Sequence, residues 1–220
     1  MVCTKTLYNY VEQGLLPIRN IDLPLKVRRK TRSSGIRRNK RILGTSIEER
    51  PCQVNDRTEF GHWEIDTVIG RKTKGEAVLL TLTERKTREE VIRKLPEKSA
   101  EAVMDSLQNL ARTAGDLFPV VFKSITADNG SEFSDLALLE ECLGPKVYFA
   151  HPYRSGERGT NEVHNGLIRR FIPKGKSLSD YSTSSLERIQ QWCNSLHRKV
   201  LGYQTPHEAF LAELAALSFA

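Results

Sequence analysis

Three acidic residues stand where their carboxylates would have a chemical use. Asp66 lies inside a strand-like run, Asp128 ends a buried run and begins an Asn-Gly turn, and Glu162 lies in the first turn of an expected helix. Aspartate is depleted in strands because its short side chain competes for backbone hydrogen bonds, so an Asp at position 66 needs a functional reason. Between the first two acids lie 61 residues, and between the last two lie 33.

Carboxylates brought from separate elements to one sheet edge would form a site for hard divalent cations. Mg²⁺ prefers oxygen ligands, keeps several waters and takes one or two carboxylates together with substrate phosphates. Two such ions about 3.5–4 Å apart activate the attacking oxygen and stabilise the leaving oxygen in phosphodiester chemistry. The pattern therefore predicts metal-dependent chemistry on a phosphodiester.

A mixed sheet must position these acids. Five runs have the composition of strands: 63–69, 77–83, 90–95, 120–126 and 146–150. In the first run, alternation places Asp66 on the face opposite Trp63. The second run is nearly all apolar, which is typical of a central strand covered on both faces. The first three runs predict an antiparallel meander.

Helices are predicted between and after these strands. Ser99 caps a helix that stops at Gly115, and others cover 136–143, the segment from Thr160, and 185–199. In the helix from Thr160, an N-cap candidate, the stripe Glu162, Asn165 and Arg169 would face the site. The order of strands and helices predicts an α/β fold, a mixed five-stranded sheet flanked by helices.

Length and composition describe one catalytic domain with an appendage. The chain has 220 residues, of which 39% are hydrophobic and 28% charged. We find no apolar run near the length of a membrane span and no signal peptide. The four cysteines are scattered without the paired spacing of a zinc site, so we expect free thiols in a reducing cytoplasm.

The net charge of +7 is concentrated in one tract. Residues 26–41 hold nine Lys or Arg and no acid, a composition suited to phosphate contacts, although it also describes a solvated linker. We therefore divide the chain into a short helical region (1–24), a basic linker (25–58) and the core (59–215). Contacts with DNA are predicted for Lys26, Arg28, Arg29, Lys30, Arg37, Arg38, Lys40 and Arg41.

Four ordered motifs carry a family resemblance. They are Gly61–Gly70 (GHWEIDTVIG), Thr126–Phe133 (TADNGSEF), Glu157–Glu162 (ERGTNE) with Asn165–Arg169, and Lys199–Pro206 (KVLGYQTP). Together they resemble the insertion-sequence-thirty family of bacterial transposases, from about residue 5 to residue 210.

The resemblance implies an RNase H-like core of the retroviral-integrase type, with Asp66, Asp128 and Glu162 as its triad. Mg²⁺ or Mn²⁺, as two ions, would serve cleavage at terminal inverted repeats and attack of the freed 3′-hydroxyl on target DNA. It also implies double-stranded DNA as partner, a homo-oligomer, because two DNA ends must meet, and a bacterial cytoplasmic, nucleoid-associated location.

The sequence departs from the family pattern in several places. Residues 1–24 are interpreted as the remnant of a helix-turn-helix region, which makes the chain N-terminally truncated. Gly156 replaces a Trp before the third acid, Val163 replaces an Asn after it, and His197 replaces a Pro. These departures lead us to hypothesise a truncated or decayed transposase.

Other residues receive lesser roles. Asn129 and Asn161 are predicted to brace the carboxylates. His151 is predicted to support the site by packing or hydrogen bonding, with a contact to DNA as the alternative. Arg158, Arg169, Lys174 and Lys176 are predicted to contact DNA.

Purely structural interpretations of these acidic residues are also possible from the sequence. Asp128 could simply start a hairpin, and Glu162 could simply favour a helix N-terminus. Glu64 is expected to be exposed, and Glu132 is interpreted as a turn residue or a support for the ligands. The alternative functions are an RNase H-like nuclease and a non-catalytic DNA-binding or dimerising fragment.

Overall fold

A computed structural model describes residues 2–23, 43–73, 75–151 and 159–217, without the side chains of Ile21, Thr160 and Glu162. The chain divides into two compact units, residues 1–39 and 40–220. None of the described helices is both long and apolar enough to cross a membrane.

The first unit contains the helix α1 (Thr4–Glu12) and the short 3-10 helix η1 (Asn20–Asp22). Val11 is the buried residue of α1, whereas Leu7 is 45% exposed. The helix ends at Glu12, shortly before the chain turns at Gly14 with a φ of 71°.

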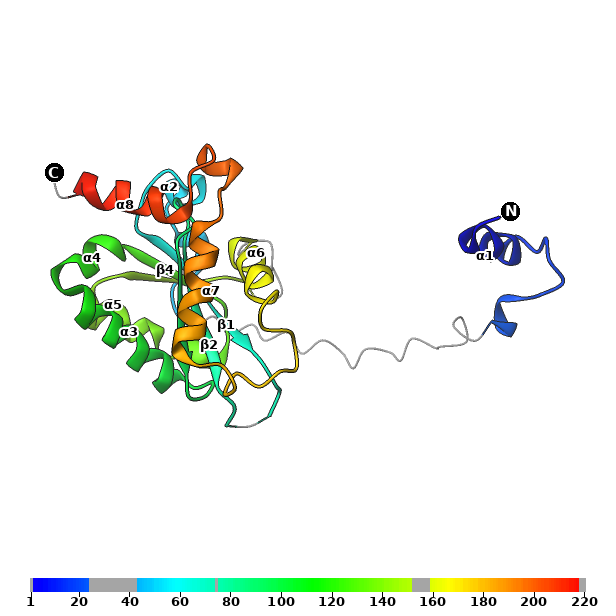
Figure 1. Ribbon diagram of the computed structural model, residues 1–220, viewed down its shortest axis with the longest axis horizontal. Helices are drawn as coiled ribbons and strands as arrows, with labels where there is room; N and C mark the ends of the chain where they lie inside the picture. The colour runs from blue at the N-terminus through cyan, green and yellow to red at the C-terminus, as the bar shows by residue number, and fades with distance from the viewer. Residues whose placement is uncertain (1, 24–42, 74, 152–158, 218–220) are drawn as a thin grey trace. The chain divides into compact units, whose positions relative to one another are not determined.

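The second unit is organised around a sheet with helices on either side (Figure 1). The sheet has five strands in the order β3-β2-β1-β4-β5. Antiparallel pairs join β1 (His62–Ile69), β2 (Val78–Glu84) and β3 (Glu90–Leu95), as the meander predicts. The strands β4 (Ser124–Ala127) and β5 (Lys146–Phe149) run parallel to β1. The prediction of a mixed five-stranded sheet is confirmed.

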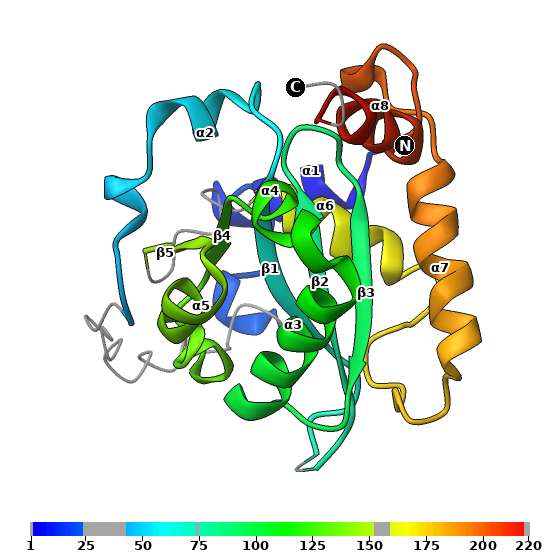
Figure 2. The ribbon, with the colours of Figure 1, turned by 90° about the vertical axis from the view of Figure 1, so that its left-hand side faces the viewer.

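Helices cover both faces of this sheet. Figure 2 shows α3 (Ala100–Ala114), α4 (Phe118–Val121) and α5 (Leu136–Leu143) on the face toward the viewer, with α6 (Gly159–Ile168) behind. Shorter or later elements are η2 (Ile47–Glu49), α2 (Cys52–Asp56), η3 (Gly115–Leu117), η4 (Ser131–Phe133), α7 (Thr183–Ser195), η6 (Lys199–Leu201) and α8 (Pro206–Leu217).

The two faces of β2 serve two separate hydrophobic clusters. Leu80 and Leu82 pack with Val103 and Leu107 of α3. Leu79, on the opposite face, joins the cluster that contains Ile168 of α6 and residues of α7. Because every residue of β2 is buried, its nearly continuous apolar sequence is explained by cover on both sides.

Two segments differ from the sequence expectation. The strand predicted from residue 120 begins at Ser124, because Pro119 starts the short helix α4 and Phe118 stacks on Phe122 with ring centroids 4.6 Å apart. Within the stretch expected to be linker, Val54 is 2% exposed and Arg50 Nη1 donates to Thr126 Oγ1 at 3.0 Å. Residues 46–58 therefore pack against the core.

The open edge of β3 is closed by side chains of α7. Gln190 Oε1 accepts from the Ile92 amide at 2.8 Å, and Asn194 Oδ1 accepts from the Glu90 amide at 2.9 Å. Asn194 Nδ2 also donates to the Glu90 carbonyl at 2.9 Å. Gln190 and Asn194 are four residues apart on the helix, a rise of about 6 Å, and Ile92 and Glu90 are two residues apart on the strand, about 6.8 Å. The spacing of the two side-chain amides therefore matches the spacing of the strand groups that they bond. These hydrogen bonds satisfy main-chain N–H and C=O groups that an uncovered edge strand would leave unpaired.

We expect Asn194→Ala to lower the free energy of unfolding by about 1–3 kcal/mol, because it leaves the buried amide and carbonyl of Glu90 without these partners. Urea unfolding followed by circular dichroism measures the difference. The matched control is Gln191→Ala, which changes an exposed amide on the same helix. Equal stability of the two variants would contradict this role.

Burial raises the pKa of Glu89 to about 7, and the nearby His207 opposes part of that rise. An unfolded chain releases this proton near pH 4.5, so the folded state loses stability as the pH rises from about 4.5 to 7. We expect Glu89→Gln to make the free energy of unfolding fall less steeply over this range. Urea titrations at several pH values test it, with the exposed Glu187→Gln as control; parallel curves for wild type and Glu89→Gln would refute it.

Candidate active site

The parallel pairing of β1 with β4 brings two of the predicted acids together. Glu64 of β1 is the register partner of Thr126 of β4. Asp66 and Asp128 each lie two residues further along the same direction, and alternate residues of a strand share one face. Since paired strands lie about 4.8 Å apart, this register predicts that the two carboxylates leave neighbouring strands on the same face of the sheet.

Donors from β1 and from α6 hold the Asp66 carboxylate. The Thr67 amide donates to Oδ1 at 2.9 Å, and Asn165 Nδ2 of α6 donates to Oδ2 at 2.7 Å. Asn165 was not among the predicted supporting residues, although its spacing of three from Glu162 on one helix indicated a shared face. Asn165 therefore attaches α6 directly to the first acid.

Asp128 is held by its own turn. Its Oδ1 accepts from the Gly130 amide at 2.9 Å. A Cβ on Gly130 would lie 2.9 Å from that oxygen and 2.5 Å from Glu132 Oε2, so any larger residue here would force one of these carboxylates to shift.

Glu132 is a buried carboxylate beside the two aspartates, 3% exposed. Its Oε1 accepts from Thr67 Oγ1 at 2.9 Å and lies 2.9 Å from Lys98 Nζ. Within the described part of the chain, no hydrogen-bond donor reaches Oε2. The residue thus links the Asp128 turn to β1 next to Asp66, which agrees with its interpretation as a support for the ligands.

The third acid lies on α6. Glu162 is one turn before Asn165, but its side chain is outside the described part of the structure. Arg169, further along the predicted stripe, donates from Nη2 to the Ile69 carbonyl at 2.7 Å. Val163 is 61% exposed, so this departure from the family pattern lies on the solvent side of the helix.

The two asparagines that were predicted to brace the carboxylates form side-chain hydrogen bonds with main-chain groups. Asn129 accepts from the Leu43 amide at 3.2 Å and donates to the Ala150 carbonyl at 2.5 Å. Asn161 Nδ2 donates to the Ile65 carbonyl at 3.3 Å, and its own amide donates to Glu64 Oε2 at 3.4 Å.

Glu64 itself is fully buried in an ion pair with Arg85, so the expectation of an exposed Glu64 was wrong. Alternation alone placed it on the correct face but could not show that α6 covers it.

The predicted DNA contacts are described only in part. Lys174 and Lys176 are exposed on the loop after α6, and the carbonyl of Lys176 approaches Gly70 at the end of β1. His151 Nε2 lies 3.2 Å from Glu48 Oε1. The tract from Lys26 to Arg41, Arg158 and Gly156 all lie outside the described residues.

The donors of this site suit a hard cation. Asp66 and Asp128 offer carboxylate oxygens from neighbouring strands, and oxygen ligands are what Mg²⁺ and Mn²⁺ prefer. Among the side chains that the structure describes, no group of three His, Cys, Asp or Glu is placed to hold a metal, and the side chain of Glu162 is not among them.

Several known proteins are similar to this chain in sequence or in fold. Residues 56–155 match the integrase core domain family. The probable transposase of the insertion-like element IS1161 from Streptococcus salivarius is 50% identical over 207 residues, which cover 94% of this chain and 58% of that protein. The transposase of IS4351 from Bacteroides fragilis is 43% identical over 164 residues, with coverage of 74% and 48%. Transposase InsI of IS30C from Escherichia coli K12 is 36% identical over 167 residues, with coverage of 76% and 42%.

The fold is also similar to the catalytic core domain of BIV integrase, with a TM-score of 0.54 and 18% identity over 73% of this chain and 99% of that one. Fold and sequence therefore define a protein with an integrase core domain. Within that class, the chain is similar in sequence to transposases of insertion sequences, including those of the insertion-sequence-thirty family that its four motifs resemble. It spans about half the length of these curated relatives.

We expect Glu132→Ala to lower the free energy of unfolding by roughly 2 kcal/mol, because Thr67 and Lys98 lose a charged partner beside Asp128. Glu132→Gln should lose less, since an amide oxygen still accepts from both. Thermal and urea unfolding measure the series, with the exposed Glu141→Ala as control. An alanine variant as stable as the glutamine variant would exclude this support.

Proposed function

We propose that this chain carries the catalytic centre of a DDE transposase, which cuts DNA at the ends of an insertion sequence and joins the freed 3′ ends to target DNA. The observation that supports it most is the β1–β4 register, which aligns Asp66 with Asp128, together with the hydrogen bond from Asn165 that attaches α6 to Asp66. Glu162 stands one turn away on that helix.

Asp66, Asp128 and Glu162 would hold the divalent ions, two Mg²⁺ or Mn²⁺. Bound there, the ions supply activation of the attacking oxygen and charge stabilisation of the leaving oxygen. The oxygen donors of the two aspartates fit this demand, and no covalent enzyme intermediate is required.

The protein's own contribution is placement. Asn165 and the Thr67 amide orient Asp66, and the Gly130 amide orients Asp128. Glu132, fixed between Thr67 and Lys98, keeps the turn after β4 against β1. Carboxylates that are already oriented do not have to be reordered when charge develops on the phosphate.

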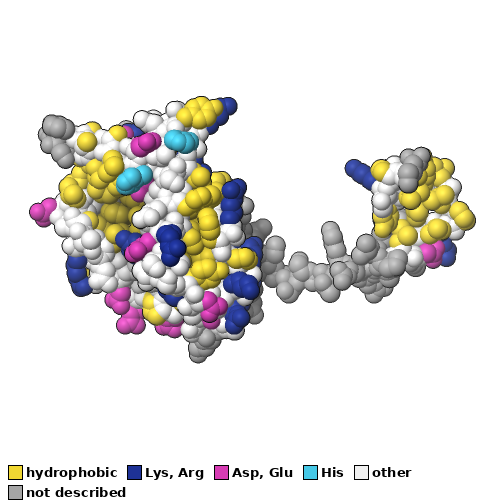
Figure 3. Space-filling model, viewed as in Figure 1, with side chains coloured by type: hydrophobic (Ala, Val, Ile, Leu, Met, Phe, Trp, Pro, Cys, Tyr) yellow, Lys and Arg dark blue, Asp and Glu magenta, His cyan; other side chains and the backbone are white. Residues whose placement is uncertain are grey.

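DNA would approach the margin that carries α6 and the segment after it. Figure 3 shows Lys and Arg side chains gathered along this side of the core. Lys174, Lys176 and Arg169 belong to this segment, and we propose that they contact phosphates together with Arg158 and the basic tract at 26–41. Such contacts weaken as salt rises and do not depend on sequence.

The remaining parts of the proposal concern assembly and location. Two element ends must be brought together, so we propose a homo-oligomer acting on terminal inverted repeats and target DNA, in the bacterial cytoplasm and close to the nucleoid. The N-terminal unit with α1 is proposed to belong to a DNA-binding region.

We expect the protein to nick and join DNA duplexes that carry the terminal repeats flanking its coding sequence, when Mg²⁺ or Mn²⁺ is present. Asp66→Asn or Asp128→Asn should reduce the rate by about 100-fold, because each removes a carboxylate charge from the metal site. Gel analysis of end-labelled duplexes measures both steps. The exposed Asp116→Asn is the matched control and should act like the wild type.

The alternatives give different results in the same assay. Nicking without joining would indicate an RNase H-like nuclease. Salt-sensitive DNA binding with neither reaction would indicate a non-catalytic DNA-binding or dimerising fragment. Full activity in both aspartate variants would disprove the assignment of the site.

A further inference from the structure

A row of polar residues crosses the sheet beneath α6. Glu64 of β1 is the register partner of Thr83 of β2, and Thr83 is the partner of Glu90 of β3. Both glutamates and the threonine are fully buried. A buried carboxylate is costly unless it is paired and hydrogen-bonded, so each glutamate needs a fixed partner.

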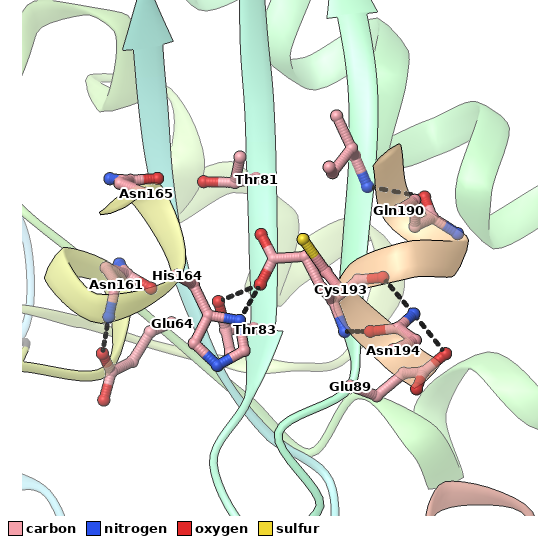
Figure 4. Close-up of polar contacts among 12 residues, drawn as sticks. Glu64, Thr81, Thr83, Glu89, Asn161, His164, Asn165, Gln190, Cys193 and Asn194 are labelled. Carbon is pink, nitrogen blue, oxygen red and sulfur yellow. Dashed lines mark hydrogen bonds and ion pairs between the residues drawn. The ribbon is translucent and has the colours of Figure 1, made fainter. Parts of the chain in front are cut away.

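The partner of Glu90 comes from α6. His164 Nδ1 lies 2.7 Å from Glu90 Oε2, and Thr83 Oγ1 donates to the same oxygen at 2.7 Å. The side chains of His164 and Glu90 are 4% and 0% exposed. Figure 4 shows His164 extending from α6 across β2 to reach this carboxylate.

Glu90 is itself held from the other side. Its amide and carbonyl are both bonded by Asn194 of α7, whose Nδ2 also donates to Glu89 Oε1 at 2.8 Å (Figure 4). The carboxylate that receives His164 therefore projects from a main chain fixed at both its polar groups.

His164 differs from the other polar anchors of α6 in the strand that it reaches. Asn161, Asn165 and Arg169 all bond to β1, so they hold the helix along a single line. A helix held along one line can still roll about its axis. The pair with Glu90 adds a contact two strands away, on β3, and a second line of contact prevents that roll.

We propose that His164, through its buried pair with Glu90, is a positioning residue that sets the rotation of α6 and thereby the direction from which Glu162 meets Asp66 and Asp128. The inference rests on the proposed function of the triad. His164 is two residues after Glu162 and one before Asn165, so a roll of the helix would displace both neighbours together.

Mn²⁺ binding by the purified full chain tests the proposal without relying on DNA cleavage. Titration followed by electron paramagnetic resonance gives the affinity. We expect His164→Leu and Glu90→Leu to weaken Mn²⁺ binding about tenfold, the lower end of the effect of removing a residue that orients metal ligands. Glu90→Gln, which keeps an oxygen for His164 and Thr83, should rescue most of it.

Two controls separate positioning from general loss of stability. Gln190→Ala removes a bond between α7 and β3 without touching α6, so it should lower stability and leave Mn²⁺ affinity unchanged. The rate of hydrogen exchange at the main-chain amides of α6 measures directly how firmly the helix is held. It should be faster in both leucine variants, whereas exchange in α3 should match the wild type.

The outcomes are distinct. If Asp128→Asn abolishes Mn²⁺ binding but both leucine variants bind as the wild type does, the proposed metal site stands and the positioning role is wrong. Unchanged exchange in α6 of the leucine variants overturns the role as well, whatever the metal does. Wild-type protein that binds no Mn²⁺ through Asp128 contradicts the proposed function and, with it, this inference.

Discussion

The parallel pairing of β1 with β4 is the constraint on which the rest of this structure depends. It joins residues some 60 positions apart in the sequence, and it sets Glu64 opposite Thr126. A shift of one residue would turn the carboxylate of Asp66 or Asp128 to the other face, into the apolar cluster under α3. Apolar residues of both strands, such as Ile65 and Ile125, are buried in that cluster and would have to leave it, which makes the shift costly.

The two faces of the sheet are built from different interactions. Under α3 and α5, buried residues such as Leu80, Val103 and Phe133 form an almost wholly apolar layer. Under α6 and α7, apolar packing surrounds buried polar contacts, the ion pair of Glu64 with Arg85 and the close contact of His164 with Glu90. The first face supplies most of the non-directional stabilisation from burial. The second face carries the directional contacts that reach the candidate site.

Sequence patterns predicted the parts of the fold that depend on local signals. The helix from Ser99 to Gly115, the apolar strand before Glu84 and the turn at Asp128 all follow from caps, periodicity and turn residues. The placement of Asp66 opposite Trp63 followed from alternation. What no pattern could give was the identity of partners distant in the chain.

Those distant partners account for the differences. Glu64 looked exposed because its cover comes from Arg85 and from α6. Residues 46–58 were predicted to be linker because their composition is polar. Composition alone does not show that Arg50 hydrogen-bonds to Thr126 of β4. Asn165 was visible as a motif residue, yet its bond to Asp66 depends on how α6 lies across the sheet. The roles of Asp66, Asp128 and Glu162 remain predictions of the sequence.

The composition of α6 explains why polar contacts, and not apolar packing, must place it. Of its buried side chains in the described structure, Asn161 and His164 are polar and Ile168 is apolar, while Val163 faces solvent. Burial of Ile168, with the partly buried Leu167 packed against the same cluster, attracts the helix to the sheet but permits many rotations, because apolar contact has no preferred direction. Hydrogen bonds and ion pairs weaken steeply when their geometry changes. A helix that must deliver one carboxylate to one point is therefore better fixed by a few buried polar contacts than by a larger apolar face.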